Sequence, residues 1–243
     1  MIARRSFLIA FAVLALLSSA CFCGLFDDPE DGYNPDPSSE AIIETDAPVQ
    51  PPARVNGRTD IGFRPNPNGF SFENYGEDTE NLTAAELQRM FGDQVCSSIR
   101  NGKCTLTPPA KQWMKEMNAD MSGGHCEGMA ALSLLMFTGQ VPPQDFGGQT
   151  ASDLDLENAD LQHEIAYWWA TQATSPTVDQ VITGTPSEIL DVLLNMDARQ
   201  ETYTLGIYQP DGSDGHAITP FAVEDQGNGI YNVWVYDNNL PGE

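Results

Sequence analysis

Basic residues are scarce in this sequence. It contains 11 Lys and Arg residues against 35 Asp and Glu, which gives a formal net charge of −24, and its only lysines are Lys103, Lys111 and Lys115. Binding to nucleic acid or to an anionic membrane surface depends on clustered basic side chains that displace counterions. The composition therefore excludes both as partners. An acid excess of this kind fits a soluble secreted surface better than a protein adapted to a saline habitat.

The chain also lacks an apolar run long enough to form a stable membrane span. Its N-terminus instead carries Arg4 and Arg5, then the apolar residues 6–17, then small residues up to Ala20. This order is typical of a secretory signal peptide, which we place at residues 1–20. The paired arginines, followed by Phe7-Leu8, also resemble a twin-arginine export signal.

Cys21 directly follows the predicted signal peptide and resembles a bacterial lipoprotein cleavage site, although Ser18 stands where such sites usually have leucine. The alternative is simple cleavage after Ala20. In both cases we expect an exported bacterial protein, either secreted or lipid-anchored at the cell surface through Cys21.

Residues 21–60 are rich in Asp, Glu and Pro and show almost no apolar periodicity. Such a segment buries too little surface to offset its ordering entropy, so we predict a disordered tether. The remaining residues, 61–243, are enough for one domain with a real core and contain no internal repeat. The chain ends soon after its last predicted strand, so the domain is either unusually short or the front part of a longer protein.

Two kinds of pattern divide the predicted domain. Capping signals and apolar spacings of three and four predict helices in its first part. We expect them between Thr83 and Gly92, after Thr107, from Cys126 onward, and over residues 157–172 and 185–196. From Thr202 the segments are short and rich in β-branched and aromatic residues, which predicts strands over 202–208, 216–223 and 230–237. Helices followed by an antiparallel sheet indicate an α+β fold.

Cysteine is also sparse, and the five cysteines fall into three groups. Cys96 and Cys104 flank a segment whose Asn101-Gly102 pair is a strong turn signal. In an oxidising compartment we expect a disulfide between them. With Cys21 and Cys23 outside the domain, Cys126 is the odd thiol.

Cys126 stands at the start of a predicted helix, directly after Gly123, Gly124 and His125. The free N–H groups and positive dipole end of a helix N-terminus stabilise a thiolate and can hydrogen-bond an oxyanion. The glycines would also let a substrate approach closely. The alternative is that Cys126 acts only as a small apolar side chain packed under the helix, which is a common role of free cysteines.

A cysteine nucleophile needs a histidine base and a group that orients it. Of the three histidines, His125 adjoins the cysteine and points elsewhere, and His163 lies in a helix at the surface or its boundary. His216 opens one predicted strand and Asp237 closes the next, so the two can be cross-strand neighbours. Asn238 and Asn239 are alternatives to Asp237.

A helix-borne cysteine, then a strand beginning Gly215-His216-Ala217, then a strand ending in Asp resembles the papain-like cysteine peptidase superfamily, in particular its bacterial peptidase-like and transglutaminase-like branches. The resemblance covers roughly residues 123–242. It implies a papain-like α+β fold, with helices packed on a C-terminal antiparallel sheet, and a triad of Cys126, His216 and Asp237.

The sequence departs from the papain pattern in two respects. The spacing from Cys126 to His216 is shorter than in papain. The glutamine that papain-like enzymes place before the cysteine is replaced by Asp120, and the nearest upstream amides are Asn118 and Gln112. These departures leave the donor to the oxyanion unidentified.

We therefore expect an exported, cysteine-dependent hydrolase or acyltransferase that acts on peptide or amide bonds of a peptide or protein substrate, as a monomer and without a cofactor. The main alternative is a non-catalytic extracellular binding module that keeps the fold. Two metal-based interpretations are weaker. Cys126, His216 and Asp237 are residue types that bind zinc, but zinc ligands usually occur in pairs a few residues apart in the sequence, and these three do not. His125-Cys126-Glu127 matches part of a zinc deaminase signature, but the P-C-x-x-C half is absent.

Overall fold

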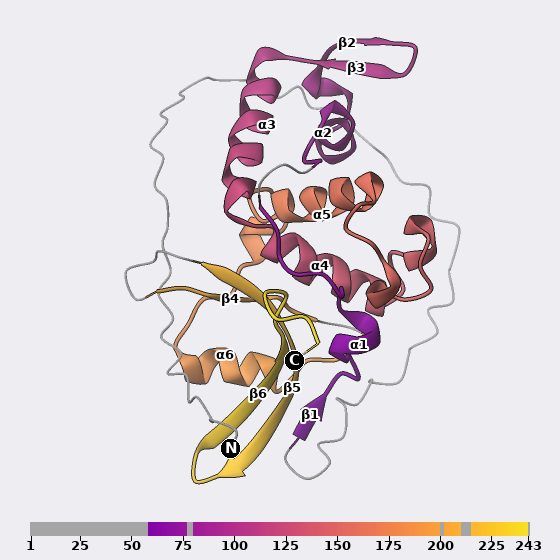
Figure 1. Ribbon diagram of the computed structural model, residues 1–243. Helices are drawn as coiled ribbons and strands as arrows, with labels where there is room; N and C mark the ends of the chain where they lie inside the picture. The colour runs from indigo at the N-terminus through magenta and orange to yellow at the C-terminus, as the bar shows by residue number, and fades with distance from the viewer. Residues whose placement is uncertain (1–57, 77–79, 200–201, 210–214, 243) are drawn as a thin grey trace, which may run out of the picture.

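The computed structural model describes residues 58–76, 80–199, 202–209 and 215–242. Helices occupy most of its first half, and an antiparallel sheet closes the chain (Figure 1). The predicted α+β arrangement is therefore observed. The predicted signal peptide and almost all of the predicted tether lie outside the described residues.

The sheet is built around β5 (His216–Gly227), the longest of the described strands. One edge of β5 pairs first with β4 (Leu205–Ile207) and then with β1 (Arg58–Asp60), and its other edge pairs with β6 (Ile230–Tyr236). All of these pairings are antiparallel. Pro220 interrupts the middle of β5, where proline removes a hydrogen-bond donor. It lies between the parts paired with β4 and β1, beside a register shift against β6, so that the missing donor is tolerated.

The domain begins earlier than we predicted. Arg58–Asp60 form β1, and Thr59 within it is buried and donates a hydrogen bond from Oγ1 to the carbonyl oxygen of Leu194 at 2.8 Å. The predicted boundary at Ile61 is therefore wrong by at least three residues. A composition rule misses such a strand because its pairing partner lies far away in the sequence.

The helices begin where the capping signals place them. Thr83 and Thr185 each form a capping box with a glutamate three residues later, and Thr107 and Asn158 cap through their side chains. The α-helices are α1 (Pro65–Asn68), α2 (Ala84–Phe91), α3 (Pro108–Asp120), α4 (Cys126–Phe137), α5 (Ala159–Thr171) and α6 (Pro186–Leu193). Short 3₁₀ turns lie at Asp93–Val95, Met121–Gly123, Pro143–Phe146, Ala151–Asp153 and Val178–Gln180.

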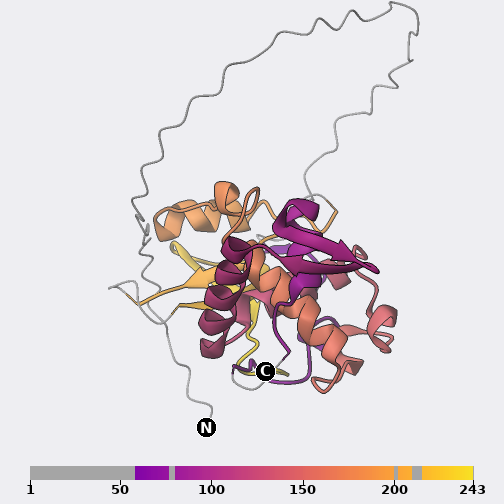
Figure 2. The same ribbon diagram turned by 90° about the horizontal axis from the view of Figure 1, so that it is seen from above.

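Helix α4 is apolar on nearly all of its surface, which is expected of a helix covered on several sides. It packs against α5 on one side and against β5 on the other. Its Leu134 belongs to a core cluster shared with the sheet and α6, and its Met129 and Leu132 belong to a second cluster shared with α5. The stack of α5, α4 and sheet is visible in Figure 1, and Figure 2 shows α6 beside the strands. The first residue of α4 is therefore held at the junction of helices and sheet.

A small hairpin stands at the opposite end of the molecule from the sheet (Figure 1). It consists of β2 (Cys96–Arg100) and β3 (Lys103–Leu106), and the predicted disulfide Cys96–Cys104 joins its strands. Asn101 and Gly102 form the turn with positive φ angles, as the sequence predicted. Among the described residues no helix is long and apolar enough to span a membrane.

Candidate active site

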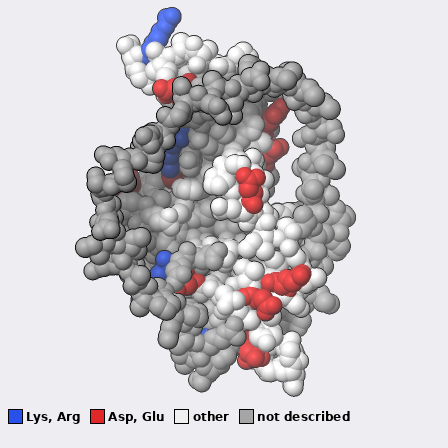
Figure 3. All heavy atoms as spheres, turned by 180° about the vertical axis from the view of Figure 1, so that it is seen from behind, with Lys and Arg blue, Asp and Glu red and all other residues white. Residues whose placement is uncertain are grey.

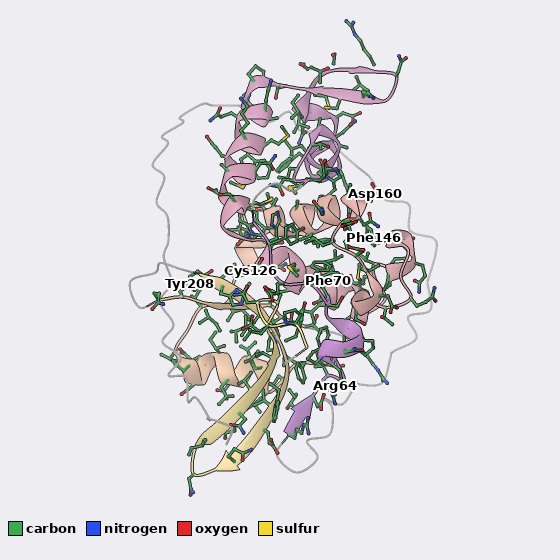
Figure 4. All side chains as sticks on the ribbon, viewed as in Figure 1. Arg64, Phe70, Cys126, Phe146, Asp160 and Tyr208 are labelled. Carbon is green, nitrogen blue, oxygen red and sulfur yellow. A yellow bond between two sulfur atoms is a disulfide. The ribbon has the colours of Figure 1, made fainter. Side chains whose placement is uncertain are left out.

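Cys126 is the first residue of α4, and it is the free cysteine of the described chain. Its side chain is partly exposed, and no side chain caps the helix N-terminus that it occupies. The first-turn N–H groups of α4 are therefore available beside the sulfur. Figure 4 shows Cys126 at the end of α4 that faces the strands.

The loop that leads into α4 is held by an asparagine from far upstream. Oδ1 of Asn74 accepts a hydrogen bond from the backbone N–H of His125 at 2.7 Å. Nδ2 of Asn74 donates to Oδ1 of Asn239 at 3.0 Å, and its backbone N–H donates to the carbonyl oxygen of Asn238 at 2.7 Å. Asn74 thus joins the N-terminus of α4 to the segment that follows β6.

The two glycines before the cysteine have different roles. Gly124 has a φ of +134°, and an added Cβ would lie 2.8 Å from Nδ2 of Asn74. Nothing lies within 4 Å of a Cβ placed on Gly123. We expected both to open a path for substrate, but Gly124 makes room for the Asn74 amide, and only Gly123 borders open space.

His216 begins β5, and Asp237 follows the last residue of β6. Because Tyr236 pairs with Thr219, Asp237 is not directly opposite His216 but diagonal to it. Nε2 of His216 and Oδ1 of Asp237 are nevertheless 2.7 Å apart, within the reach of diagonal cross-strand neighbours. Asp237 also accepts a hydrogen bond from the backbone N–H of Asn239 at 2.9 Å, which fixes its orientation.

The side chain of Cys126 also interacts with the imidazole of His216, and this interaction contributes to the raised pKa of the ring. Since Nε2 is bonded to Asp237, the ring leaves Nδ1 for the sulfur. Burial disfavours the charged ring, but the hydrogen bonds from Cys126 and Asp237 and the negative charges of both outweigh it, so the pKa of His216 lies above its ordinary value of 6.5. The three residues singled out in the sequence thus lie at one place, with His216 hydrogen-bonded to Asp237 and within interaction range of Cys126.

Asn238 connects the two halves of this arrangement. It is fully buried, and its Nδ2 donates to the carbonyl oxygens of Cys126 and Ala217, both at 3.0 Å. These bonds fix the first turn of α4 against the start of β5, and therefore the sulfur against the imidazole. Asn238 and Asn239 bond to backbone and to Asn74 respectively, so the contact with His216 belongs to Asp237, in preference to the two asparagine alternatives.

The other histidines take part in structural contacts. His125 is fully buried and stacks on Tyr75, with Nδ1 2.8 Å from the carbonyl oxygen of Tyr75 and Nε2 2.7 Å from Oδ1 of Asn81. Its pKa is lowered by burial, in part offset by the hydrogen bond to Tyr75. His163 is partly exposed, and its Nδ1 contacts the carbonyl oxygen of Asn81 at 2.6 Å.

The upstream amides that the sequence offered as oxyanion donors point elsewhere. Asn118 bonds to the backbone of Leu82, and Gln112 bonds to Glu116. The amide at the site belongs to Asn74, which sequence reasoning missed. It lies in an irregular segment with no periodic signal, and a sequence separation of 51 from His125 hides the contact.

Within the described ranges, no group of three or more His, Cys, Asp and Glu side chains is arranged to hold a metal ion. Comparisons of the chain with protein-family models, with curated proteins and with solved structures find no match. The chemistry of the site is therefore argued from its own geometry. A thiol, an imidazole and a carboxylate in series beside free helix N–H groups can transfer a proton from sulfur and stabilise an oxyanion.

Proposed function

We propose that the protein is a cysteine-dependent hydrolase or acyltransferase of the papain-like type, acting on peptide or amide bonds. Cys126 is its nucleophile, His216 its general base and Asp237 the residue that orients the imidazole. The observation that carries this proposal is the His216–Asp237 hydrogen bond at the start of α4, where the imidazole also interacts with Cys126 and Asn238 ties the two elements together. An inert packed cysteine would need neither the imidazole nor the carboxylate behind it.

The reaction follows from these positions. Nδ1 of His216 takes the proton of the Cys126 thiol, and the sulfur attacks the carbonyl carbon of the substrate to form a tetrahedral oxyanion. The first-turn N–H groups of α4 donate to that oxyanion. The imidazolium then gives its proton to the leaving amine as the C–N bond breaks, which leaves a thioester on Cys126. Water releases the acyl group as an acid, or a second amine accepts it.

The raised pKa of His216 supports this role. A protonated imidazole bonded to Asp237 favours a thiolate beside it, so the reactive ion pair can exist at mildly acidic pH. The ring is protonated below its pKa, and the stabilisation that it offers to a thiolate is lost as the pH rises through that pKa.

The direct test is alkylation of Cys126 with iodoacetamide, followed by peptide mapping. At pH 6 wild-type Cys126 should react at least about tenfold faster than a free thiol, because the imidazole and the N-terminus of α4 activate the sulfur. His216→Ala should slow this reaction by about tenfold or more, and Asp237→Ala should slow it less. If Cys126 reacts at the rate of an ordinary thiol, and His216→Ala changes nothing, the proposal fails.

A non-catalytic extracellular binding module is the second candidate. It is favoured by apolar side chains exposed on β6, which among the described residues pairs only with β5. Ile230 is 60% exposed, Tyr231 37% and Trp234 48%. An unreactive Cys126 together with partner binding that is lost in Trp234→Ser would favour this candidate.

We further propose that the protein works outside the cytoplasm, secreted or anchored through Cys21. The disulfide Cys96–Cys104 is compatible with an oxidising compartment. The test is fractionation of cells that express the wild type and Cys21→Ser. Release of the variant from membranes indicates a lipid anchor, and recovery of both proteins only from the cytoplasm contradicts export.

A further inference from the structure

Glu127 lies next to the nucleophile and has no part in the proposed triad. It is the second residue of α4, and its Oε1 accepts a hydrogen bond from Oγ1 of Thr204 at 2.9 Å. Within the described part of the chain, no Lys, Arg or His side chain forms an ion pair with it. The site thus contains a carboxyl group whose partner is a neutral hydroxyl.

The short strand β4 brings an aromatic ring to the same place. Thr204 precedes β4, Tyr208 follows it, and Ile207 pairs with His216. The Tyr208 ring lies where side chains on Gly206 and Gly215 would otherwise stand, since a Cβ on either residue would come within 2.9 Å and 2.6 Å of its ring carbons. Figure 4 shows Tyr208 at the end of β4 nearest to Cys126.

The electrostatics of these groups are linked. The Tyr208 hydroxyl leans back over β4, 3.3 Å from a Cβ placed on Gly206, and so toward Thr204 and its partner Glu127. Burial, followed by the negative charges of Glu127 and Cys126, raises the pKa of Tyr208. Burial raises the pKa of Glu127 to about 7, and the hydrogen bond from Thr204 lowers it only in part. An ionised Glu127 is therefore poorly solvated and, beside a thiolate, opposed by a like charge. A cation bound between the carboxylate and the ring would relieve both costs.

We propose that Glu127 and Tyr208 form a cation-binding subsite beside Cys126, and that the substrate carries a lysine-like ammonium or arginine-like guanidinium group next to the scissile carbonyl. This inference rests on the proposed function, because it names the substrate class for the same nucleophile. Thr204 holds the carboxylate in place, and the Tyr208 ring supplies a face for the cation.

The charge of the whole molecule suits this substrate. With 35 acidic against 11 basic residues, the protein attracts cations and repels anions at long range. On the face shown in Figure 3, acidic side chains are scattered over the described surface and basic ones are few. Long-range attraction acts on any cation near the surface, so a test of the subsite must separate the local carboxylate from this general field.

Methanethiosulfonates of different charge provide that test on the full-length protein. The thiolate attacks the sulfenyl sulfur, a mixed disulfide forms and methanesulfinate leaves, whatever the charge of the transferred group. We would measure the second-order rate at Cys126 by quenching and peptide mapping at pH 8.5, with the cationic 2-aminoethyl, the neutral methyl and the anionic 2-sulfonatoethyl reagent. Wild type should prefer the cationic over the anionic reagent by about tenfold or more.

The variants assign the preference to its source. Glu127→Gln keeps the shape of the side chain and should lower the cationic-to-anionic ratio by about tenfold, while Tyr208→Leu should lower it by about two- to fivefold. Glu157→Gln removes the same charge from an exposed position before α5 and should change the ratio less than twofold. Circular dichroism checks that each variant is folded.

The outcomes separate this inference from the function on which it rests. If the neutral reagent reacts rapidly with Cys126 but Glu127→Gln leaves the charge ratio unchanged, or Glu157→Gln lowers it equally, the subsite is wrong and the nucleophile stands. If the neutral reagent reacts with Cys126 no faster than with a free thiol, the proposed function itself fails, and the substrate assignment falls with it.

Discussion

At the scale of single residues, Glu127 shows how the candidate site affects stability. Its pKa is raised from an ordinary 4.5 to about 7, mainly by burial. Between these pH values the folded state holds a proton that the unfolded state has lost, so the free energy of unfolding falls as the pH rises, and the loss is complete above pH 7. The ionised form of Glu127 therefore lowers the stability of the folded protein.

Glu127→Gln should leave stability almost unchanged at pH 4.5 and raise it by roughly 1–3 kcal/mol at pH 8. Urea unfolding at the two pH values measures this difference. Glu188→Gln is a control of opposite sign, because the backbone and side-chain hydrogen bonds from Thr185 lower the pKa of Glu188. The Glu188→Gln variant should therefore be less stable than the wild type at pH 8, where Glu188 is ionised in the wild type. An equal gain for Glu127→Gln at both pH values would contradict the argument.

The glycines before Cys126 give a second residue-scale prediction. Gly124→Ala should destabilise the protein by roughly 1–3 kcal/mol, because its positive φ disfavours a side chain and the new Cβ displaces Asn74. It should also slow alkylation of Cys126, since Asn74 fixes the loop before α4. Gly123→Ala is the matched control, with open space around it, and should change stability by less than about 0.5 kcal/mol. Similar losses in both variants would mean that any side chain is harmful in this loop.

At the scale of elements, α4 and α5 approach more closely than helices with ordinary side chains can. A Cβ on Gly128 would lie 2.1 Å from the carbonyl oxygen of Ile165. Gly128→Ala should therefore cost roughly 1–3 kcal/mol or more by overpacking, despite the gain of about 1 kcal/mol in helix propensity. Thermal unfolding of this variant measures the balance, and Ala131→Gly in the same helix measures the propensity contribution. A stabilised Gly128→Ala protein would show that the helices can separate without cost.

The elements also show what local sequence could predict. The capping boxes at Thr83 and Thr185 and the strand patterns after Thr202 depend on residues a few positions apart, and the structure contains them as predicted. Strand β1 and the hydrogen bond from His125 to Asn74 depend on partners more than 50 residues away. Rules based on residue spacing cannot predict these contacts, because the contacts form only when distant segments pack together in the folded protein.

The same limit applies to the candidate site. Cys126, His216 and Asp237 could be proposed because each lies at or next to the end of a helix or strand, and the ends of elements can be predicted from local sequence. The proximity of Glu127 and Tyr208 to the site could not be predicted from the sequence, because it depends on the pairing of β4 with β5 and on the burial of Glu127 in the folded protein.

At the scale of the whole molecule, the disulfide hairpin β2–β3 stands at one end, and the candidate site lies in the middle, beyond α2, α3 and α5 (Figure 1). Replacing Cys96 and Cys104 together by serine should lower stability by about 2–3 kcal/mol, from the entropy of an eight-residue separation. The alkylation rate of Cys126 in the folded variant should stay within about twofold of wild type. A large fall in that rate in a folded variant would show that the hairpin influences the site, contrary to their separation.

The junction at Asn238 has a consequence for the order of events during folding. The thiol belongs to the helical layer, whereas its imidazole and carboxylate belong to the sheet, and Asn238 bonds to both. As the chain is made, Cys126 emerges long before His216, and it meets its base only when the last strands dock. Under the proposed function, the sulfur is therefore activated only after the sheet has docked on the helical layer, so that an incompletely folded chain carries an ordinary thiol.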